Sequence, residues 1–216
     1  MWPDSYKRDV PDEAQAKLET YHALLMKWQN AINLVSPKTL DEAWVRHFLD
    51  SAQVVAHIPE TVQTVADFGS GAGFAGLVVA ILRPDLKVSL IESDERKAQF
   101  LRTVSRETQI RVEIFAERIE AVVARSLPPD LVMARALADL ETLLGLIAPW
   151  AENNPALTGL FLKGAQWEEE TQKARMLFDF QADCFQSLTA PEGRIVRVEN
   201  IRPKGGGVVD SSLKGL

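Results

Sequence analysis

The feature that most limits the possible folds is a glycine-rich loop between a strand-like segment and a helix-like segment. Residues 64–68, TVADF, form a short apolar run, and residues 69–73 that follow hold three alternating glycines. Residues 74–84, FAGLVVAILRP, have the composition of a buried helix that stops before Pro84. A strand, a glycine loop and a helix in this order predict the first unit of a parallel α/β sheet, with a ligand at the loop.

The rest of the chain continues the alternation of strands and helices. The apolar patterns predict strands at 87–93, 111–117, 130–135 and 159–164, and helices at 94–108, 118–127, 137–150 and 167–178. Two further strands, at 180–188 and 194–201, have no clear helix between them, which predicts an antiparallel pair at the edge of the sheet. We therefore expect an α/β protein with a mostly parallel sheet and helices on both faces.

The segment before Pro59 is predicted to be helical. One helix should be broken by the turn-forming residues 33–37, NLVSP, and a second should cover residues 41–55. Apolar side chains at helical spacing form the expected inner faces: Leu18, Tyr21, Leu25, Trp28 and Ile32, then Trp44, Val45, Phe48, Leu49 and Ala52. We divide the chain into an N-terminal helical segment at 1–60, a ligand-binding domain at 61–204 and a flexible tail at 205–216.

Composition and charge exclude several classes of protein. The net charge of −6 argues against a positively charged coat for nonspecific nucleic-acid binding, although residues 194–204 carry a local group of arginine and lysine side chains. The single cysteine, Cys184, fits a reducing cytoplasm and is expected to be a small buried hydrophobe. No apolar run is long enough to span a bilayer, and the polar N-terminus does not resemble a signal peptide. His22 and His57 have no neighbouring ligand residues, so we assign no metal.

The glycine loop can be read in two frames that favour different cofactors. Residues 71–76 match the G-x-G-x-x-G pattern of dinucleotide-binding proteins, whereas residues 67–73 match the D-x-G-x-G-x-G pattern of S-adenosylmethionine-dependent methyltransferases. The carboxylate of Asp67 would repel a pyrophosphate, but it suits S-adenosylmethionine, which carries an ammonium and a sulfonium. Glu92 fits either cofactor, because its oxygens can accept hydrogen bonds from the ribose hydroxyls. The aspartate therefore favours S-adenosylmethionine over a dinucleotide-dependent oxidoreductase.

Six motifs in a fixed order resemble the RsmG, or GidB, family. They are NLVSP (33–37), RHFLDS (46–51), DFGSGAGFAG (67–76), ERIEA (117–121), ARAL (134–137) and FLKG (161–164). Members of this family are bacterial methyltransferases that modify guanine N7 in the 16S ribosomal RNA of the small subunit. The resemblance implies a Rossmann-like class I methyltransferase fold, with a seven-stranded sheet, an antiparallel edge strand and an N-terminal helical extension. It implies 16S ribosomal RNA, or an assembled or partly assembled small subunit, as the partner.

The same resemblance implies a set of functional residues. The expected cofactor contacts are Asp67, Gly69, Gly71, Gly73, Phe74, Glu92, Ile119, Glu120 and Arg135, and the expected catalytic basic residues are Arg118, Arg135 and Lys163. Arg135 ends a buried strand and should need an anionic partner, whereas Arg118 can equally be an ordinary surface cation of a helix.

Two further motif positions carry expectations, one from the residues and one from the comparison with the family. In RHFLDS, Arg46 and Asp50 have the spacing of an exposed ion pair, and we expect the helix to pack on the cofactor domain. Ala75 stands where the family usually has proline, which predicts a slightly looser loop.

Methyl transfer to guanine N7 requires no general base, since N7 carries a lone pair and no proton. We therefore expect catalysis to come mainly from alignment of the reactants, without a catalytic dyad. The residues alone also allow a methyltransferase that acts on a small molecule or a protein, and a noncatalytic RNA-binding module is a further alternative. Without an obvious exposed apolar patch, a monomer is the expected state. Whether the substrate is naked RNA or an assembled subunit stays open.

Overall fold

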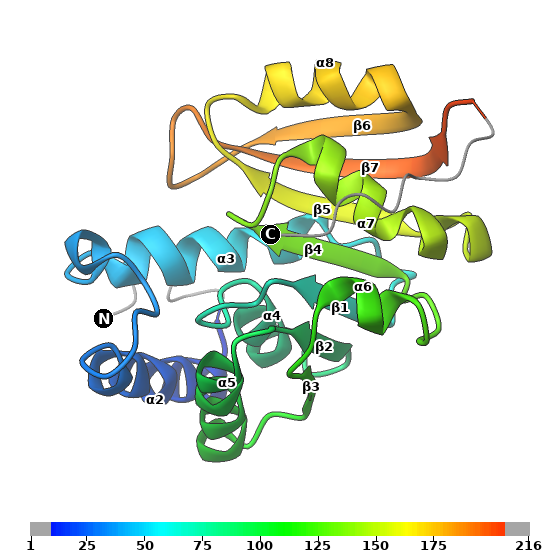
Figure 1. The fold of residues 1–216 in the computed structure, drawn as a ribbon. Helices are drawn as coiled ribbons and strands as arrows, with labels where there is room; N and C mark the ends of the chain where they lie inside the picture. Colours follow the sequence, from blue (N-terminus) through cyan, green and yellow to red (C-terminus); the bar gives the residue numbers. More distant parts are fainter. Residues whose placement is uncertain (1–9, 206–216) are drawn as a thin grey trace.

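The computed structural model describes residues 10–205, which form a seven-stranded sheet with helices on both faces (Figure 1). The strand order is β3-β2-β1-β4-β5-β7-β6. The strands are β1 Thr64–Phe68, β2 Lys87–Ile91, β3 Val112–Phe115, β4 Leu131–Arg135, β5 Thr158–Lys163, β6 Phe178–Gln186 and β7 Arg194–Pro203. Each predicted strand is confirmed, with shifts of a few residues at the ends.

The direction of the strands agrees with the predicted fold class. Strands β1 to β5 pair in parallel, whereas β7 is antiparallel to both β5 and β6. The closing pair lies at the edge of the sheet as expected, and β7, the strand of opposite direction, lies between β5 and β6 rather than outermost. The order of the strands reverses between β1 and β4, so the carboxyl ends of these two strands form the switch point where ligands bind in such sheets.

Helices cover the two faces of the sheet and bury a separate hydrophobic cluster on each. The helices are α2 Asp12–Trp28, α4 Gly76–Leu82, α5 Glu95–Thr108, α6 Ile119–Val123, α7 Leu140–Asn153 and α8 Trp167–Leu177. Adjacent strand residues point to opposite faces, so that Val65 packs in the cluster with α2, α4 and α5, and Ala66 packs in the cluster with α6 and α7. The same alternation determines on which face of the sheet each polar strand side chain lies.

Helix α2 packs directly on α4 and α5 (Figure 1) and shares their core. Leu18, Tyr21 and Leu25 are fully buried, as their spacing predicts. The helix ends at Trp28, so the prediction that Ile32 belongs to it is wrong, although Ile32 still packs against the same core. The Gln29 side chain explains the early end: its amide oxygen accepts hydrogen bonds of 3.0 Å from the backbone N–H groups of Leu34 and Val35, which closes the chain into a turn.

The second N-terminal helical stretch is irregular. It consists of a 3₁₀ turn η1 Pro37–Thr39, a π-helical segment η2 Trp44–Leu49, a short α3 Asp50–Ala52 and a 3₁₀ segment η3 Gln53–His57. It ends before Pro59, as predicted. The predicted inward face is wrong for Val45, whose surface is 42% exposed, because the π-helical turn rotates the following residues relative to a regular α-helix. Phe48 and Leu49 are buried as expected.

Cys184 is exposed, which corrects the prediction that it is a small buried hydrophobe. It lies in the second half of the edge strand β6, beyond Phe178 and Phe180, which pack into the core. An edge strand is covered only where a helix lies on it, and burial along β6 falls toward its end. The predicted tail at 205–216 lies outside the described residues except for Gly205.

Candidate functional site

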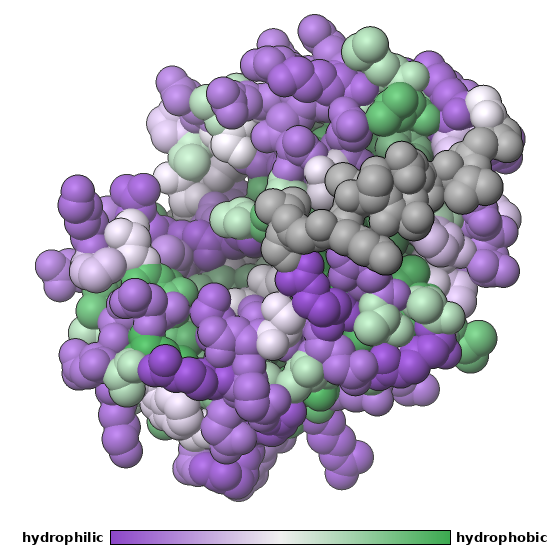
Figure 2. Space-filling view, in the orientation of Figure 1, coloured by the Kyte–Doolittle hydropathy of each residue, from purple (hydrophilic) through white to green (hydrophobic). Residues whose placement is uncertain are grey.

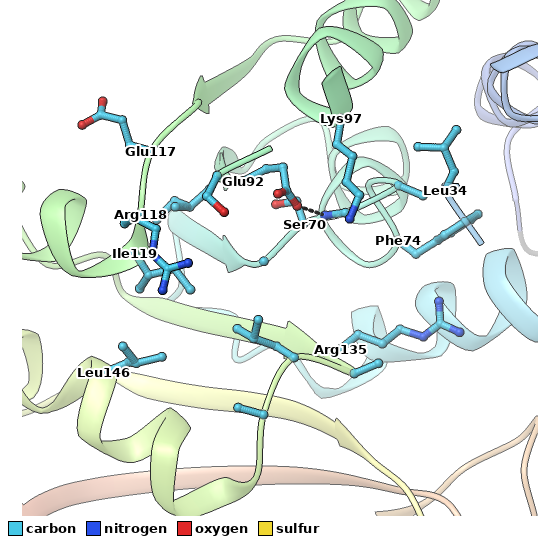
Figure 3. A pocket seen from close by; sticks show the side chains of 18 of the residues that line it. Leu34, Ser70, Phe74, Glu92, Lys97, Glu117, Arg118, Ile119, Arg135 and Leu146 are labelled. Atoms are coloured by element: carbon cyan, nitrogen blue, oxygen red, sulfur yellow. Dashed lines mark hydrogen bonds between the residues drawn. The ribbon is translucent and has the colours of Figure 1, made fainter. Parts of the chain in front are cut away.

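A cavity of about 580 Å³ opens at the carboxyl ends of the central strands, within the size range of small-molecule sites. It brings together most of the site residues expected from the sequence: Gly69, Gly71, Phe74, Glu92, Arg118, Ile119, Glu120 and Arg135. Figure 3 shows the labelled side chains of this set around a common space, with Glu92 on one side and Arg135 on another. The surface near these strand ends is hollowed and mostly hydrophilic in Figure 2.

The glycine loop takes a backbone path that other residues would strain. Gly69, Gly71 and Gly73 all have positive φ, at 62°, 56° and 87°. A Cβ atom on Gly69 would also lie 2.6 Å from Cδ1 of Leu137, a lining residue on the opposite loop. Gly73 does not line the cavity; its Cβ would collide with Leu77 in α4. Gly69 and Gly71 therefore shape the cavity, and Gly73 allows the loop to turn into the helix.

Asp67 lies under the glycine loop and does not line the cavity. Strand alternation places its side chain on the same face as Val65, toward α4, where it is 1% exposed. One carboxylate oxygen accepts a hydrogen bond of 3.2 Å from the backbone N–H of Gly76, the first residue of α4. Burial, with a smaller contribution from the nearby charge of Glu92, raises the pKa of Asp67 to about 7. The expected direct cofactor contact is therefore replaced by support of the loop from below.

Glu92 follows β2 and presents its carboxylate to the cavity (Figure 3). Its two oxygens accept hydrogen bonds of 2.8 Å from the backbone N–H groups of Gly71 and Asp94. These bonds fix the carboxylate against the glycine loop, and Glu92 as a whole is only 7% exposed. Each carboxylate oxygen has a second lone pair, so both remain able to accept a hydroxyl from a ligand.

The far side of the cavity is formed where β3 leads into α6. Arg118 precedes the first turn of α6, and Ile119 and Glu120 are its first residues. The guanidinium of Arg118 lies 3.8 Å from the carboxylate of Glu120, and both side chains are 53% exposed. A pair so exposed is weakly held in water, so both charges are available to a ligand or a partner.

Arg135 ends β4 and has the anionic partner that its position predicts. Its Nε lies 2.9 Å from Oδ2 of Asp50 in α3, with the two side chains 20% and 16% exposed. Its Nη2 donates to the backbone oxygen of Arg46 at 2.8 Å and contacts Nδ1 of His47 at 3.0 Å. Arg46 itself pairs with Glu42, at 3.5 Å, so the expected Arg46–Asp50 pair is wrong. The RHFLDS helix does pack on the cofactor domain, as predicted.

Lys163 ends β5 and is held away from the large cavity. Its side chain is 6% exposed and lines a neighbouring cavity of about 130 Å³. The ammonium donates to the backbone oxygen of Ala138 at 2.6 Å and pairs with Glu170 at 2.6 Å. The same Glu170 oxygen accepts a hydrogen bond from the backbone N–H of Leu140 at the start of α7. Lys163 therefore supports the loop after β4, whereas we expected it at the mouth of the site.

The residues that line the cavity without having been assigned to the site from the sequence include Lys97 and His47. Lys97 in α5 points its ammonium toward Ser70 (Figure 3). Its position in an amphipathic helix gave no signal that it would lie at the site. His47 stacks on Phe74 with ring centroids 4.9 Å apart. Burial, together with the nearby charges of Arg135 and Arg46, lowers the pKa of His47 to about 4. The imidazole is therefore neutral at pH 7, and the helical spacing of RHFLDS alone could not place it here.

The N-terminal segment forms hydrogen bonds to the backbone of the glycine loop and of the residues that follow it. The hydroxyl of Tyr21 donates to the backbone oxygen of Ala72, and Oγ of Ser51 accepts from the backbone N–H of Ala75 at 3.2 Å. Ala75 has φ 70° and ψ −59°. Proline cannot adopt this φ, and it has no N–H to donate this hydrogen bond. The expectation that alanine only loosens a proline-type loop is therefore wrong: the backbone at Ala75 is one that proline cannot take.

Two of the four arginine and lysine residues at 194–204 form ion pairs with acidic neighbours. Arg197 pairs with Asp183 at 2.5 Å, and Lys204 lies 3.4 Å from Asp179. The basic group expected around residues 194–204 is therefore interleaved with carboxylates across β6 and β7. Within residues 10–205, no group of three His, Cys, Asp or Glu side chains is arranged to hold a metal, and no helix is long and apolar enough to cross a membrane.

Comparison with known proteins assigns the family. The family model for rRNA small subunit methyltransferase G, GidB, matches residues 14–195. The chain belongs to this family. It is 46% identical over 196 residues to ribosomal RNA small subunit methyltransferase G of Rhodospirillum centenum, covering 91% of this chain and 88% of that protein. The protein of the same name from Parvibaculum lavamentivorans is 43% identical over 201 residues, covering 92% and 88%.

A solved structure supports the fold independently of close sequence similarity. The rRNA methylase from Streptococcus thermophilus superposes with a TM-score of 0.52, covers 70% of this chain and 95% of its own, and is 16% identical in sequence. At this level of identity the likeness shows the fold alone. The sequence resemblance to the RsmG family and the predicted methyltransferase fold are both confirmed.

Proposed function

We propose that this protein transfers a methyl group from S-adenosylmethionine to N7 of a guanine in 16S ribosomal RNA. Membership of the small-subunit methyltransferase family supports the reaction class and the substrate. The observation that carries the proposal is the cavity at the switch point, which sets a fixed Glu92 carboxylate against an open glycine loop. An enzyme acting on ribosomal RNA in a bacterium works in the cytoplasm, where we place this protein.

The chemistry of the cavity fits S-adenosylmethionine. Glu92 would accept hydrogen bonds from the ribose hydroxyls through its remaining lone pairs. Gly69 and Gly71 leave the backbone bare, which allows a ligand to approach it closely. Ile119 and Glu120 would read the adenine edge, since they lie after β3 beside Glu92. In its charged form, Asp67 beneath the loop would favour a cofactor that carries an ammonium and a sulfonium.

The proposed reaction needs alignment more than proton transfer. When bound, the cofactor supplies a sulfonium-linked methyl group: a bond forms between N7 and the methyl carbon, the sulfur–carbon bond breaks with its electron pair going to sulfur, and the positive charge moves to guanine. The protein's part is to hold the two reactants in line, which in favourable systems provides several kcal/mol. The stacked Phe74 and His47 rings and the fixed Arg135 guanidinium make the wall of the cavity rigid on the N-terminal side.

The chemistry of guanine also limits the form of RNA that can react. N7 lies on the major-groove edge, which is deep and narrow in A-form RNA. The target guanine should therefore be unpaired or displaced when it reaches the cavity. The exposed guanidinium of Arg118, which lines the cavity, would contact its phosphates or base.

The test is transfer of a radiolabelled methyl group to small subunits and to naked 16S ribosomal RNA from a strain that lacks this protein. Label at one guanine N7 is expected from the wild-type protein, with a loss of about tenfold or more in the Arg135→Ala variant. Lys173→Ala, an exposed lysine paired with Glu169 on α8, is the control that should stay fully active. Cofactor binding with no labelling of either RNA form would contradict the substrate, and no cofactor binding would contradict the reaction.

A further inference from the structure

The guanidinium of Arg135 is held by one segment of the chain on two of its three nitrogens. Asp50 takes Nε, while the backbone oxygen of Arg46 and Nδ1 of His47 take Nη2. All three partners come from η2 and α3, a segment that is remote from β4 in sequence. A guanidinium has five N–H donors, so these contacts occupy one on Nε and two on Nη2.

The remaining two donors belong to Nη1. Nη1 of Arg135 makes no hydrogen bond or ion pair with any side chain or backbone group of residues 10–205. Arg135 lines the cavity, and its guanidinium carbon lies 5.7 Å from the centre of the Phe74 ring. In Figure 3 the side chain runs from the end of β4 to a position below Phe74. Nη1 is thus the part of the guanidinium left for a group inside the cavity.

The two side chains that hold Arg135 are themselves fixed from behind. Asp50 accepts hydrogen bonds on Oδ1 from Nε2 of Gln53, at 2.9 Å, and from the hydroxyl of Thr189 in the β6–β7 turn. Gln53 in turn accepts from the backbone N–H of Leu188 at 2.8 Å. Oδ2 of Asp50 is therefore free to face Arg135 alone. An ion pair that served only to attach the N-terminal segment would need no such backing.

His47 is fixed in a similar way, and its tautomer follows from its contacts. Nε2 of His47 lies 2.8 Å from the hydroxyl of Thr39, and Nδ1 faces a donor of Arg135. Because arginine can only donate, Nδ1 must accept, so the ring proton lies on Nε2 and is donated to Thr39. Stacking on Phe74 sets the plane of the ring. The imidazole acts as a neutral acceptor aimed at Arg135.

We propose that Asp50 and His47 are positioning residues that hold Arg135 with its two Nη1 hydrogens aimed at an anionic oxygen of a ligand in the cavity. The inference rests on the proposed function and names how one residue of that site is set. The anionic oxygen belongs to the carboxylate of the cofactor or to a phosphate of the RNA, since both chemistries suit a guanidinium.

The test measures two quantities separately, the affinity for cofactor analogues and KM for small subunits. Both are measured on wild-type protein and on Arg135→Ala, Asp50→Asn and His47→Phe. Calorimetry gives the affinity for S-adenosylhomocysteine, which keeps the carboxylate, and for methylthioadenosine, which lacks it. Methyl transfer gives KM for small subunits. His47→Phe keeps a ring to stack on Phe74 but cannot accept a hydrogen bond, whereas His47→Asn restores an acceptor and should recover function. Asp183→Asn removes the carboxylate of an ion pair with Arg197 on β6 and β7, and serves as the matched control.

We expect Asp50→Asn and His47→Phe each to reproduce the defect of Arg135→Ala in the same quantity, by about tenfold. A weaker affinity for S-adenosylhomocysteine alone assigns the carboxylate, and a raised KM alone assigns the phosphate. Combining either variant with Arg135→Ala should add nothing, because the positioning residue then has nothing to position. Additive losses, or losses that follow the melting temperature and are shared by His47→Asn, would overturn the proposal. Absence of any S-adenosylhomocysteine binding by the wild-type protein would instead refute the proposed function.

Discussion

At the scale of single residues, the buried carboxylate of Asp67 should link pH to cofactor binding. Its pKa is raised from 3.8 to about 7, mainly by burial, so its contribution to stability is present at low pH and is lost as pH rises through 7. A cofactor with two positive groups favours the charged carboxylate. We therefore predict that S-adenosylmethionine raises the melting temperature more at pH 8 than at pH 6.

Asp67→Asn is the control for this pH dependence. The amide oxygen can still accept from the backbone N–H of Gly76, but the side chain no longer titrates. Melting curves of both proteins at pH 6 and pH 8, with and without S-adenosylmethionine, decide the matter. An equal pH dependence in Asp67→Asn would show that another group is responsible.

Ala75 carries a second prediction at this scale. Its φ of 70° is costly for alanine, and its N–H donates to Ser51. Ala75→Pro should cost about 3 kcal/mol or more in the free energy of unfolding, since proline loses both the φ and the donor. Ala75→Gly should stay within about 1 kcal/mol of wild type, because relief of strain offsets the greater freedom of the unfolded chain.

Urea unfolding of the two Ala75 variants measures this difference. Ser51→Ala leaves the N–H of Ala75 without its acceptor and should fall between them, at about 1–2 kcal/mol. Equal stability of Ala75→Pro and Ala75→Gly would mean that the loop follows another backbone path.

At the scale of elements, α2 supports the cofactor loop through Tyr21. The buried hydroxyl donates to the backbone oxygen of Ala72, and the ring stacks on Phe74 with centroids 5.5 Å apart. Tyr21→Phe should lower stability by about 1–3 kcal/mol, because it leaves a buried carbonyl unpaired, and should also weaken cofactor binding. Thr20→Ala, on the exposed face of the same helix, is the control for unfolding and calorimetry. If Tyr21→Phe lowers stability but leaves the affinity for the cofactor unchanged, then α2 does not influence the site.

The sequence predicted the elements well where local periodicity decides them. Strand β1 follows from its short apolar run before the glycines, and helix α5 follows from its helical spacing. The sequence could not predict that Lys163 turns away to Glu170, or that Asp50 reaches Arg135 rather than Arg46. Such partners lie far apart in the chain, and the π-helical turn at Trp44–Leu49 changes which side chains face the sheet. Motif residues could be named, but their partners depend on tertiary packing.

At the scale of the whole molecule, a net charge of −6 must be reconciled with an RNA substrate. Carboxylates of β6 pair with Arg197 on β7 and with Lys204 just after it, while Arg118 at the cavity is 53% exposed and only loosely paired with Glu120. The favourable phosphate contacts should therefore be few and concentrated near the cavity. Binding to 16S ribosomal RNA should accordingly show a shallow dependence on salt.

Arg118→Ala tests this view and decides between an RNA contact and a surface cation. If Arg118 neutralises one phosphate, the variant should bind RNA more weakly at low salt, and its slope of log affinity against log salt should be smaller by about 1. Arg83→Ala removes an arginine paired with Asp85 at the far end of α4, and should leave both affinity and slope unchanged. Filter binding of a 16S fragment at several salt concentrations measures both. An unchanged slope in Arg118→Ala would make Arg118 a surface cation and move the phosphate contacts to other residues around the cavity, with Lys97 the first to examine.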